Sequence, residues 1–380
     1  MKRCNLLLIF ILSTIASIAQ VSDFTLSSSI KTDGLFFDND TMYVAEGWSG
    51  SRVFKILPDG VVTIFCTNLD GPIDVVKRSN GHFYVSEWNS GRIAEITPLG
   101  IVSFYVTVSP GPGPMTLDKE DNIYVTHNTN NGSGSITRID TAGNAHPFYS
   151  GPPLNNPGGI AFDESGKLYV ANFNNGEINV ISPTAQTKLL ATIPVSGTWK
   201  TAHIKYHAGL LYVNSLSGNR IFKVDTIGQV SVLAGSGIGG HLGGPLLEAR
   251  FSNPDGLCLS PDGKILWVAK GLVSTSYFQK IDLSTSTAYD ENLISNYPFQ
   301  ILPNPAIEKV TLDLHLRRGA KVGLQMFTAD GQLVSTNIEE ERDAGPCIIT
   351  VDCHSWSNGW YVAVLSVDGA IFKKSFLIQK

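Results

Sequence analysis

Hydrophobic and polar positions alternate in short runs along this chain, and one pattern of them recurs. Each copy starts with an aromatic residue followed by Val, continues with a few polar residues, and ends in a short strand-forming segment that closes on Ile or Val. The six aromatic-Val pairs are Tyr43-Val44, Tyr84-Val85, Tyr124-Val125, Tyr169-Val170, Tyr212-Val213 and Trp267-Val268. They lie roughly 40 to 45 residues apart, with one longer gap before the last. A period of this size is typical of an array of repeated supersecondary units.

Each repeat predicts a four-stranded antiparallel meander, because four short apolar segments are separated by turn residues. In the clearest copy the expected strands are 159–162, 168–171, 177–181 and 188–192. Six such sheets placed side by side form an all-β, six-bladed β-propeller, which we assign to residues 20–289. The last copy lacks a clear fourth strand, whereas Phe24-Thr25-Leu26 precedes the first copy as a spare strand. We therefore expect this segment to pair with the last sheet and close the ring.

The two ends of the chain differ from the repeats. Residues 1–19 combine the basic Lys2 and Arg3, an unbroken apolar run at 6–12, and small residues at 17–19. The run is shorter than the ~20 residues that span a bilayer, so this pattern predicts a secretory signal peptide. After a linker at 290–296, residues 297–380 alternate with period two and predict a small Ig-like β-sandwich. The expected strands there are 310–316, 322–327, 348–351, 361–367 and 371–378.

Charge and hydropathy narrow the set of partners. The net charge is −5 and no cluster of Lys or Arg is present, which argues against nucleic acid, because phosphates are bound by a basic surface. Apart from the signal peptide, no apolar segment is long enough to predict a transmembrane helix in the mature chain. We expect an extracellular protein, glycan or small molecule as the partner.

The repeats resemble NHL repeats. The phrases that carry this resemblance are Pro-x-Gly-Ile/Leu, Leu/Ile-Tyr-Val-Ala and Asn-x-x-Arg-Ile, and the best matches are Pro254-Asp255-Gly256-Leu257 and Gly218-Asn219-Arg220-Ile221. The resemblance implies a six-bladed propeller in which the repeated Tyr, Val and Ile residues form the frame. Function then depends on loop residues that differ from one blade to the next.

The C-terminal segment resembles the sorting domain of the Bacteroidetes type IX secretion system. The residues that match its motifs are Pro303, Asn304, Pro305, Ala306, Gly359, Tyr361, Lys373 and Lys374, together with Asp330-Gly331-Gln332-Leu333-Val334. This resemblance implies export to the periplasm and then transfer across the outer membrane by the type IX machinery. Removal of the domain would then leave a released or surface-attached protein. The alternative is an Ig-like adhesive module that stays on the mature chain.

Candidate ligand-binding residues fall on one face of the predicted ring. In an antiparallel meander, the loop entering the first strand and the loop between strands two and three share a face. The candidates at the start of first strands are Asp33, Asp74, His203 and Asp255. Those three residues after the start of each aromatic-Val pair, which we call the plus-three positions, are Glu46, Glu87, His127, Asn172, Ser215 and Lys270. Carboxylate, imidazole and amide groups can bind a divalent cation, a sugar or a small polar molecule, but the same groups also serve as hydrogen-bonding partners within a blade.

Three classes of function fit these residues. The first, which we favour, is a non-catalytic extracellular propeller that binds protein, glycan or a small ligand. The second is a metal-dependent hydrolase similar to the gluconolactonase and senescence-marker-protein family, with Glu46, Asn172 and Asp255 as candidate ligands for Ca²⁺ or Mg²⁺. The third is a lyase similar to the streptogramin-cleaving propellers, with His127 or His203 as the base. No catalytic motif of either enzyme family is present at matching positions, so catalytic residues are not assigned.

Overall fold

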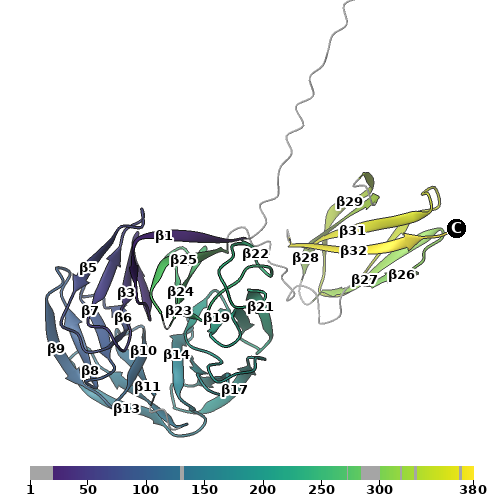
Figure 1. Cartoon of the computed structure of the whole chain (residues 1–380). Helices are drawn as coiled ribbons and strands as arrows, with labels where there is room; N and C mark the ends of the chain where they lie inside the picture. Colours follow the sequence, from purple (N-terminus) through teal and green to yellow (C-terminus); the bar gives the residue numbers. More distant parts are fainter. Residues whose placement is uncertain are drawn as a thin grey trace, which may run out of the picture. The chain divides into compact units, whose positions relative to one another are not determined.

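The computed structural model describes residues 20–128, 132–271, 273–283, 300–316, 319–328, 332–367 and 370–380, and these residues form strands and loops with no α-helix (Figure 1). They fall into two compact units, one spanning Gln20–Leu283 and a second that contains the residues from Gln300 onward. The predicted signal peptide at 1–19 and the linker at 290–296 lie outside the described residues.

Five four-stranded antiparallel sheets of the first unit follow the repeat in order. The first contains β2 (Leu35–Asp38), β3 (Thr41–Ala45), β4 (Val53–Ile56) and β5 (Val62–Cys66). The second contains β6 (Pro72–Lys77), β7 (Phe83–Glu87), β8 (Arg92–Ile96) and β9 (Val102–Thr107), and the third β10 (Pro112–Leu117), β11 (Ile123–Asn128), β12 (Gly134–Ile139) and β13 (Ala145–Ser150). The fourth contains β14 (Pro157–Phe162), β15 (Leu168–Asn172), β16 (Glu177–Ile181) and β17 (Thr187–Thr192), and the fifth β18 (Ile204–His207), β19 (Leu210–Ser215), β20 (Arg220–Asp225) and β21 (Val230–Ala234).

A sixth sheet joins the two ends of this unit. Its strand order is β22 (Gly244–Pro245), β1 (Gln20–Ile30), β25 (Thr275–Asp282), β24 (Ile265–Lys270) and β23 (Pro254–Leu259). The N-terminal strand β1 pairs antiparallel with β25, with Phe24 opposite Phe278, and the Phe24 ring meets Trp267 edge-on at a centroid distance of 5.0 Å. The expectation that the segment around Phe24 pairs with the last repeat is therefore confirmed.

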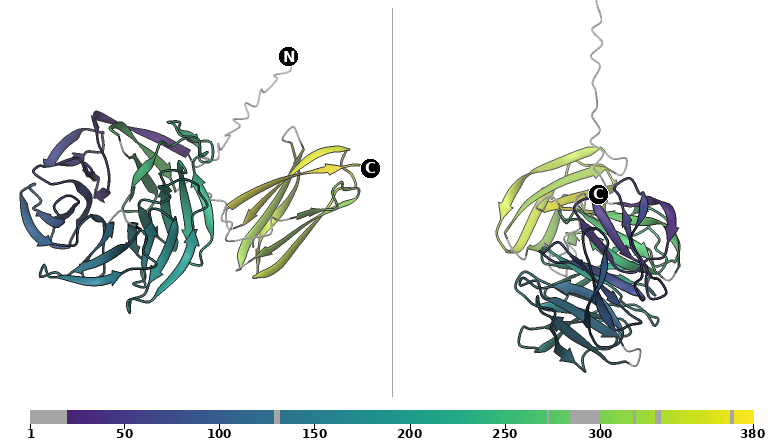
Figure 2. Two further views of the ribbon diagram at one scale, coloured as in Figure 1. Left: turned by 60° about the horizontal axis from the view of Figure 1, so that its bottom comes forward. Right: turned by 90° about the vertical axis from the view of Figure 1, so that its left-hand side faces the viewer.

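The sheets are arranged in a closed ring (Figures 1 and 2). The first strand of each sheet contacts the first strand of the next, in the order β2, β6, β10, β14, β18, β23 and back to β2. This arrangement confirms the predicted all-β, propeller-like fold.

The aromatic-Val pairs form the packing between sheets. One hydrophobic cluster joins Tyr84 and Ile93 of the second sheet to Met115, Ile123 and Val125 of the third, and similar clusters join the other neighbours. Burial of an aromatic and a β-branched side chain contributes roughly 2 kcal/mol each relative to exposure. Because these positions repeat, they stabilise the ring but do not distinguish one sheet from another.

The C-terminal unit consists of two sheets around one core. Three strands form the order β26 (Gln300–Leu302), β27 (Lys309–Leu316) and β30 (Gly345–Asp352), and four form β29 (Leu333–Arg342), β28 (Ala320–Thr328), β31 (Gly359–Val367) and β32 (Ala370–Ile378). Inward-facing residues of both sheets share a single hydrophobic cluster. The strands β26 and β29 were not predicted; β29 ends in a run of charged residues that hides its alternation.

The residues that match the sorting motifs stabilise this unit. The Asn304 side-chain oxygen accepts a hydrogen bond of 2.9 Å from the main-chain N–H of Leu377. Ala306 is fully buried and bonds through its main chain to Leu377 and Gln379. The buried Tyr361 donates its hydroxyl to the Ser357 carbonyl at 2.9 Å. The first motif is therefore attached directly to the end of the last strand.

Candidate functional site

The strand register shows which candidates occupy equivalent places in the ring. The first core residue of each first strand pairs with the Val of the aromatic-Val motif; these residues are Leu35, Val75, Met115, Ile160, Ile204 and Leu257. Asp33 and Asp255 both lie two residues before this position, whereas Asp74 and His203 lie one residue before it. The four belong to the fifth, sixth, first and second sheets, which are consecutive in the ring.

Three of these side chains converge, and we call them the channel cluster. One possible ligand atom from each of Asp33, His203 and Asp255 can be chosen so that all lie within 4.8 Å of one another. Nε2 of His203 is 4.0 Å from Oδ1 of Asp33, and Nδ1 of His203 is 3.6 Å from Oδ1 of Asp255. Ring closure creates this group, because it makes the sixth sheet a neighbour of the first.

The orientation of His203 is fixed by a buried amide. The main-chain N–H of His203 donates to Oδ1 of Asn214 at 2.7 Å, and the Asn214 amide group donates to the main-chain oxygens of Pro254, at 3.0 Å, and Asp255. Asn214 thus connects the fifth sheet to the sixth beside the cluster. Sequence analysis did not select Asn214, although it lies two residues after Tyr212, inside a repeated strand.

The same surroundings determine which ring nitrogen of His203 is free. Nδ1 lies 3.1 Å from the main-chain oxygen of Asp255, and a carbonyl can only accept, so neutral His203 carries its proton on Nδ1. Nε2 then presents a lone pair. The side chain is 3% exposed, and Nε2 has no hydrogen-bond partner among the described residues. A buried acceptor in this state is ready for a donor or a metal ion, and a metal-binding His commonly donates its other N–H to a carbonyl in this way.

The electrostatics of the cluster favour a cation. Burial, followed by the negative charges of Asp255 and Asp74, raises the pKa of Asp33 well above its ordinary value. The side chains of Asp33 and Asp255 remain 17% and 14% exposed, so solvent reaches them. One imidazole nitrogen and two carboxylates form a mixed donor set that suits Zn²⁺ or Mn²⁺ better than Ca²⁺ or Mg²⁺, which prefer oxygen ligands. The residues present therefore fit a divalent metal ion.

Asp74 lies next to this cluster but has a different role. Its side chain is buried, and its two oxygens accept the main-chain N–H groups of Val75 and Met115, each at 2.9 Å. The second of these bonds links the second sheet to the third. Asp74 contributes negative charge near Asp33, while its own oxygens hold two strands together.

The acidic plus-three residues are paired within their own loops. Glu46 accepts the main-chain N–H of Ser51 at 3.0 Å and the Nε–H of Arg52 at 2.9 Å. Burial acts to raise the pKa of Glu46, but hydrogen bonds and the Arg52 charge outweigh it and lower that pKa. Glu87 repeats the arrangement, with Arg92 Nε–H donating at 2.6 Å. The signal that sequence analysis missed is the Arg at or just before the start of each following strand.

The other plus-three residues also form hydrogen bonds with the protein. Asn172 accepts the Asn155 main-chain N–H at 3.1 Å and donates to the Pro153 carbonyl at 2.8 Å. Nε2 of His127 lies 2.8 Å from the Thr137 hydroxyl, and Oγ of Ser215 accepts the Gly218 N–H at 3.1 Å. The main-chain oxygen of Lys270 accepts the Thr32 hydroxyl at 2.7 Å. Of the three residues first considered for a metal, Glu46, Asn172 and Asp255, only Asp255 belongs to the channel cluster.

Comparison with known families identifies the C-terminal unit. Residues 300–379 match the family described as the secretion system C-terminal sorting domain. The chain therefore carries a type IX sorting tail, as its motifs predicted, and this tail indicates export through the periplasm to the surface or the medium. Among the described residues, no helix has the length and apolar character needed to cross a membrane.

Comparison with solved structures supports the fold of the first unit. A virginiamycin B lyase from Staphylococcus aureus shares 16% identity over 69% of this chain and 99% of its own, with a TM-score of 0.51. A gluconolactonase from Xanthomonas campestris shares 14% over 70% and 95%, with a TM-score of 0.53. A protein of unknown function from Bacteroides thetaiotaomicron shares 16% over 70% and 76%, with a TM-score of 0.57. At these identities the likeness concerns the fold alone, and no curated protein matches the sequence.

Proposed function

We propose that this chain is an exported, six-bladed NHL-type propeller that binds a divalent cation at Asp33, His203 and Asp255 and, with it, a small polar ligand. The observation that carries the proposal is the buried Nε2 of His203, which has no hydrogen-bond partner among the described residues and faces the Asp33 carboxylate. A buried polar atom without a partner costs about 1–3 kcal/mol. In a native fold such a group is commonly satisfied by an ordered water or an ion, and the two carboxylates beside His203 favour the ion.

Each residue of the cluster has a distinct part in this proposal. His203 supplies a neutral nitrogen whose direction is set by its Nδ1–H bond to the Asp255 carbonyl. Asp33 and Asp255 supply negative charge, which the cation would neutralise. Asn214 acts as a positioning residue, because it holds both the His203 main chain and the Asp255 carbonyl. Three protein ligands leave room for solvent or a ligand on a bound metal.

The route of the protein to its place of action forms part of the proposal. A signal peptide at 1–19 would direct the chain to the periplasm, where the propeller at 20–289 folds. The sorting domain at 297–380, joined by the linker at 290–296, would then pass the chain to the type IX machinery. The family match at 300–379 supports the sorting step, and this route would bring the cation site to the cell surface or the medium.

Calorimetric titration of the chelator-treated mature chain tests the cation site. We expect Mn²⁺ or Zn²⁺ to bind with 1:1 stoichiometry and more tightly than Ca²⁺ or Mg²⁺. Replacement His203→Gln should weaken binding about 10- to 100-fold, while the matched control Glu46→Gln, on the same face but paired with Arg52, should leave it unchanged. Absence of binding, or equal binding by the His203 variant, would overturn the proposal.

A metal-dependent hydrolase is the second candidate. The observation in its favour is that the cluster is partly exposed, so water and a substrate could both reach the cation. Similarity in fold to a gluconolactonase makes sugar lactones the first substrates to test. Turnover that requires added metal and is lost in Asp33→Asn would select the hydrolase. Metal binding without turnover of lactones would favour the binding module.

A further inference from the structure

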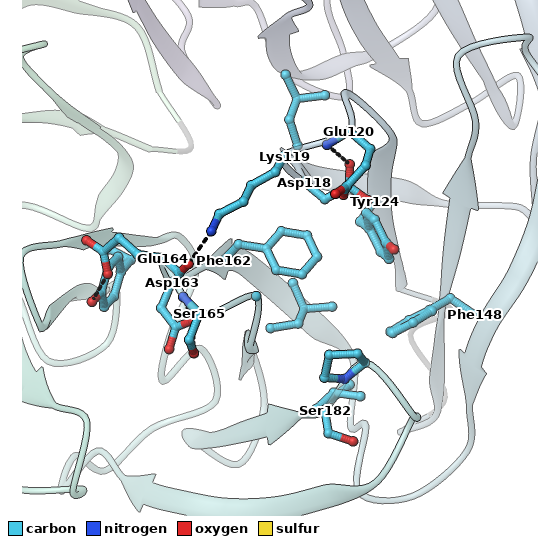
Figure 3. Close-up of a pocket in the computed structure, with 16 residues that line it drawn as sticks. Asp118, Lys119, Glu120, Tyr124, Phe148, Phe162, Asp163, Glu164, Ser165 and Ser182 are labelled. Atoms are coloured by element: carbon cyan, nitrogen blue, oxygen red, sulfur yellow. Dashed lines mark hydrogen bonds between the residues drawn. The ribbon is translucent and has the colours of Figure 1, made fainter.

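A second site lies on the opposite face of the ring from the channel cluster, between the third and fourth sheets. A pocket of about 530 Å³ is lined by the turn between β10 and β11, the turn between β14 and β15, and the residues that follow β16 (Figure 3). Turns between first and second strands lie on the face opposite the entry to the first strands, where the channel cluster is found. The pocket is therefore separate from the proposed cation site.

Aromatic rings form the floor of this pocket. The Tyr124 ring meets Phe148 edge-on at a centroid distance of 5.0 Å and Phe162 at 4.9 Å, and Figure 3 shows all three rings around one space. Phe148 and Phe162 are only half-buried, so parts of both rings are accessible. The other apolar lining residues are Leu117, Leu168, Ile181 and Pro183.

Acidic residues dominate the rim. The charged side chains that line the pocket are Asp118, Glu120, Asp163, Glu164 and Lys119. They combine four carboxylates with one ammonium group. Lys119 extends from one turn to the other and donates to the main-chain oxygen of Glu164 (Figure 3). The pocket already contains a cation on an alkyl chain at its rim.

The carboxylate side chains of the rim differ in how firmly hydrogen bonds hold them. Asp163 is held by its own turn, where Oδ1 accepts the main-chain N–H groups of Ser165 at 2.8 Å and Lys167 at 2.9 Å. Asp118 is held in the same manner by the main-chain N–H of Asn122 at 2.8 Å. Glu120 and Glu164 lie at the tips of these turns on longer side chains. Glu164 also accepts the hydroxyl of Tyr206, so a cation bound there would share this carboxylate with the tyrosine.

We propose that this pocket binds an alkylammonium or guanidinium group on an apolar stem, the chemistry of a lysine or arginine side chain. The stem would pack on Phe148 and Phe162, as long basic side chains do on apolar surfaces. The charge would lie between the aromatic faces and the acidic rim, since cations are attracted to both. An anion would meet four carboxylates, and a neutral ligand would leave their charge uncompensated.

Titration of the chelator-treated mature chain with Nα-acetyl-lysine methylamide tests this proposal. We expect saturable binding, with chemical shift changes at Phe148 and Phe162, and weaker binding as salt is added. The same compound acetylated on Nε keeps the stem and loses the charge, so it should bind at least fivefold more weakly. Equal binding of the two compounds, or no binding of either at millimolar concentration, would overturn the proposal.

Variants with opposite expected effects sharpen this experiment. Glu164→Gln and Glu120→Gln should each weaken binding about two- to fivefold, as expected for partly exposed ion pairs, and Phe148→Leu should weaken it because the ring face is lost. Lys119→Met should tighten binding, because it removes the competing ammonium group. Asp40→Asn, in the corresponding turn of the first sheet, is the matched control and should change nothing. Reversed effects at Lys119 and Glu164 would contradict a cationic ligand.

The same titrations can distinguish a lysine of a polypeptide partner from a free amine as the bound cation. A pentapeptide with a central lysine that binds at least tenfold more tightly than the single amino-acid derivative would indicate a polypeptide partner, and equal affinities would indicate a free amine. Either result supports the stated chemistry. Because Asp33→Asn should not alter this binding, failure here and failure of the cation site are independent outcomes.

Discussion

Polar residues occupy two sets of positions on the same face of the ring, and the two sets differ in one respect. At the plus-three positions, the side chains of Glu46, Glu87 and Asn172 accept or donate hydrogen bonds within their own or an adjoining loop. At the start of the first strands, His203 keeps one buried nitrogen without such a bond, beside a carboxylate whose pKa is raised. The residue types are similar in both sets. Each set contains one buried ring nitrogen without a hydrogen-bond partner among the described residues, Nδ1 of His127 and Nε2 of His203. Of these two histidines, His203 is the one that lies beside two carboxylates, those of Asp33 and Asp255.

This difference separates stability from function. A polar group whose bonds are complete stabilises the fold, and its loss leaves partners unsatisfied. A group held in an unfavourable state lowers stability unless a ligand compensates for it, as is common at functional sites. Substitution in the first set should therefore destabilise the protein without affecting cation binding. Substitution in the channel cluster should instead weaken cation binding without destabilising the protein.

The largest effect is expected for Glu87→Ala. The carboxylate is 1% exposed and accepts bonds from Arg92 and, at 2.7 Å, from the main-chain N–H of Asp70. Its removal leaves that N–H without an acceptor and breaks the ion pair with Arg92, which is 40% exposed, so the free energy of unfolding should fall by about 3 kcal/mol. Urea denaturation measures this loss, and calorimetry should find cation affinity unchanged. A stable variant with weakened cation binding would reverse the assignment of the two sets.

A pH-dependent effect of similar size is expected at His127. Burial lowers the pKa of this residue from 6.5 to about 4. His127 therefore becomes protonated below pH 6.5 in the unfolded chain, but only below about pH 4 in the folded chain. Because the unfolded chain binds the proton more tightly, the free energy of unfolding should decrease as pH falls through this range, by about 3 kcal/mol in total.

The comparison of wild type with His127→Gln isolates this contribution. The variant should show a flatter dependence of unfolding free energy on pH between 4 and 7, because glutamine does not titrate. His207→Gln serves as a control at an exposed position and should follow the wild-type curve. If the His127 variant also followed that curve, the burial of a neutral imidazole would not be a determinant of acid stability.

Much of the fold could be predicted from the sequence because its signals are local. The aromatic-Val pairs mark second strands, turns such as Asp163 to Gly166 mark their ends, and the spare strand at Phe24 indicated ring closure. These features depend on alternation and turn chemistry over a few residues. The strand β29 was not predicted, because the charged residues at its end interrupt the alternation of hydrophobic and polar residues.

The site was harder to predict, since its members are distant in sequence. Asp33 and His203 are brought together only by closure of the ring, and their different offsets from the first core residue are visible only in the strand register. From the sequence, Glu46 and Asp255 were equally good candidates for a metal ligand, because the pairing of Glu46 with Arg52 depends on the direction of the side chains. What distinguishes a satisfied carboxylate from an unsatisfied one is the set of donors around it, which a one-dimensional pattern does not contain.

The smallest effect, and the most discriminating, is expected for Asp33→Asn. Burial and the charges of Asp255 and Asp74 raise the pKa of Asp33, so the folded chain binds a proton more tightly than the unfolded chain, and stability falls as pH rises from about 4 toward the raised value. Removing the charge should stabilise the chelator-treated protein at pH 7, with no gain at pH 4. The same variant should bind Mn²⁺ at least tenfold more weakly. Asp74→Asn is the matched contrast: Asp74 accepts two main-chain N–H groups, so its replacement should destabilise the fold, and a gain in stability there would remove the distinction between the two carboxylates.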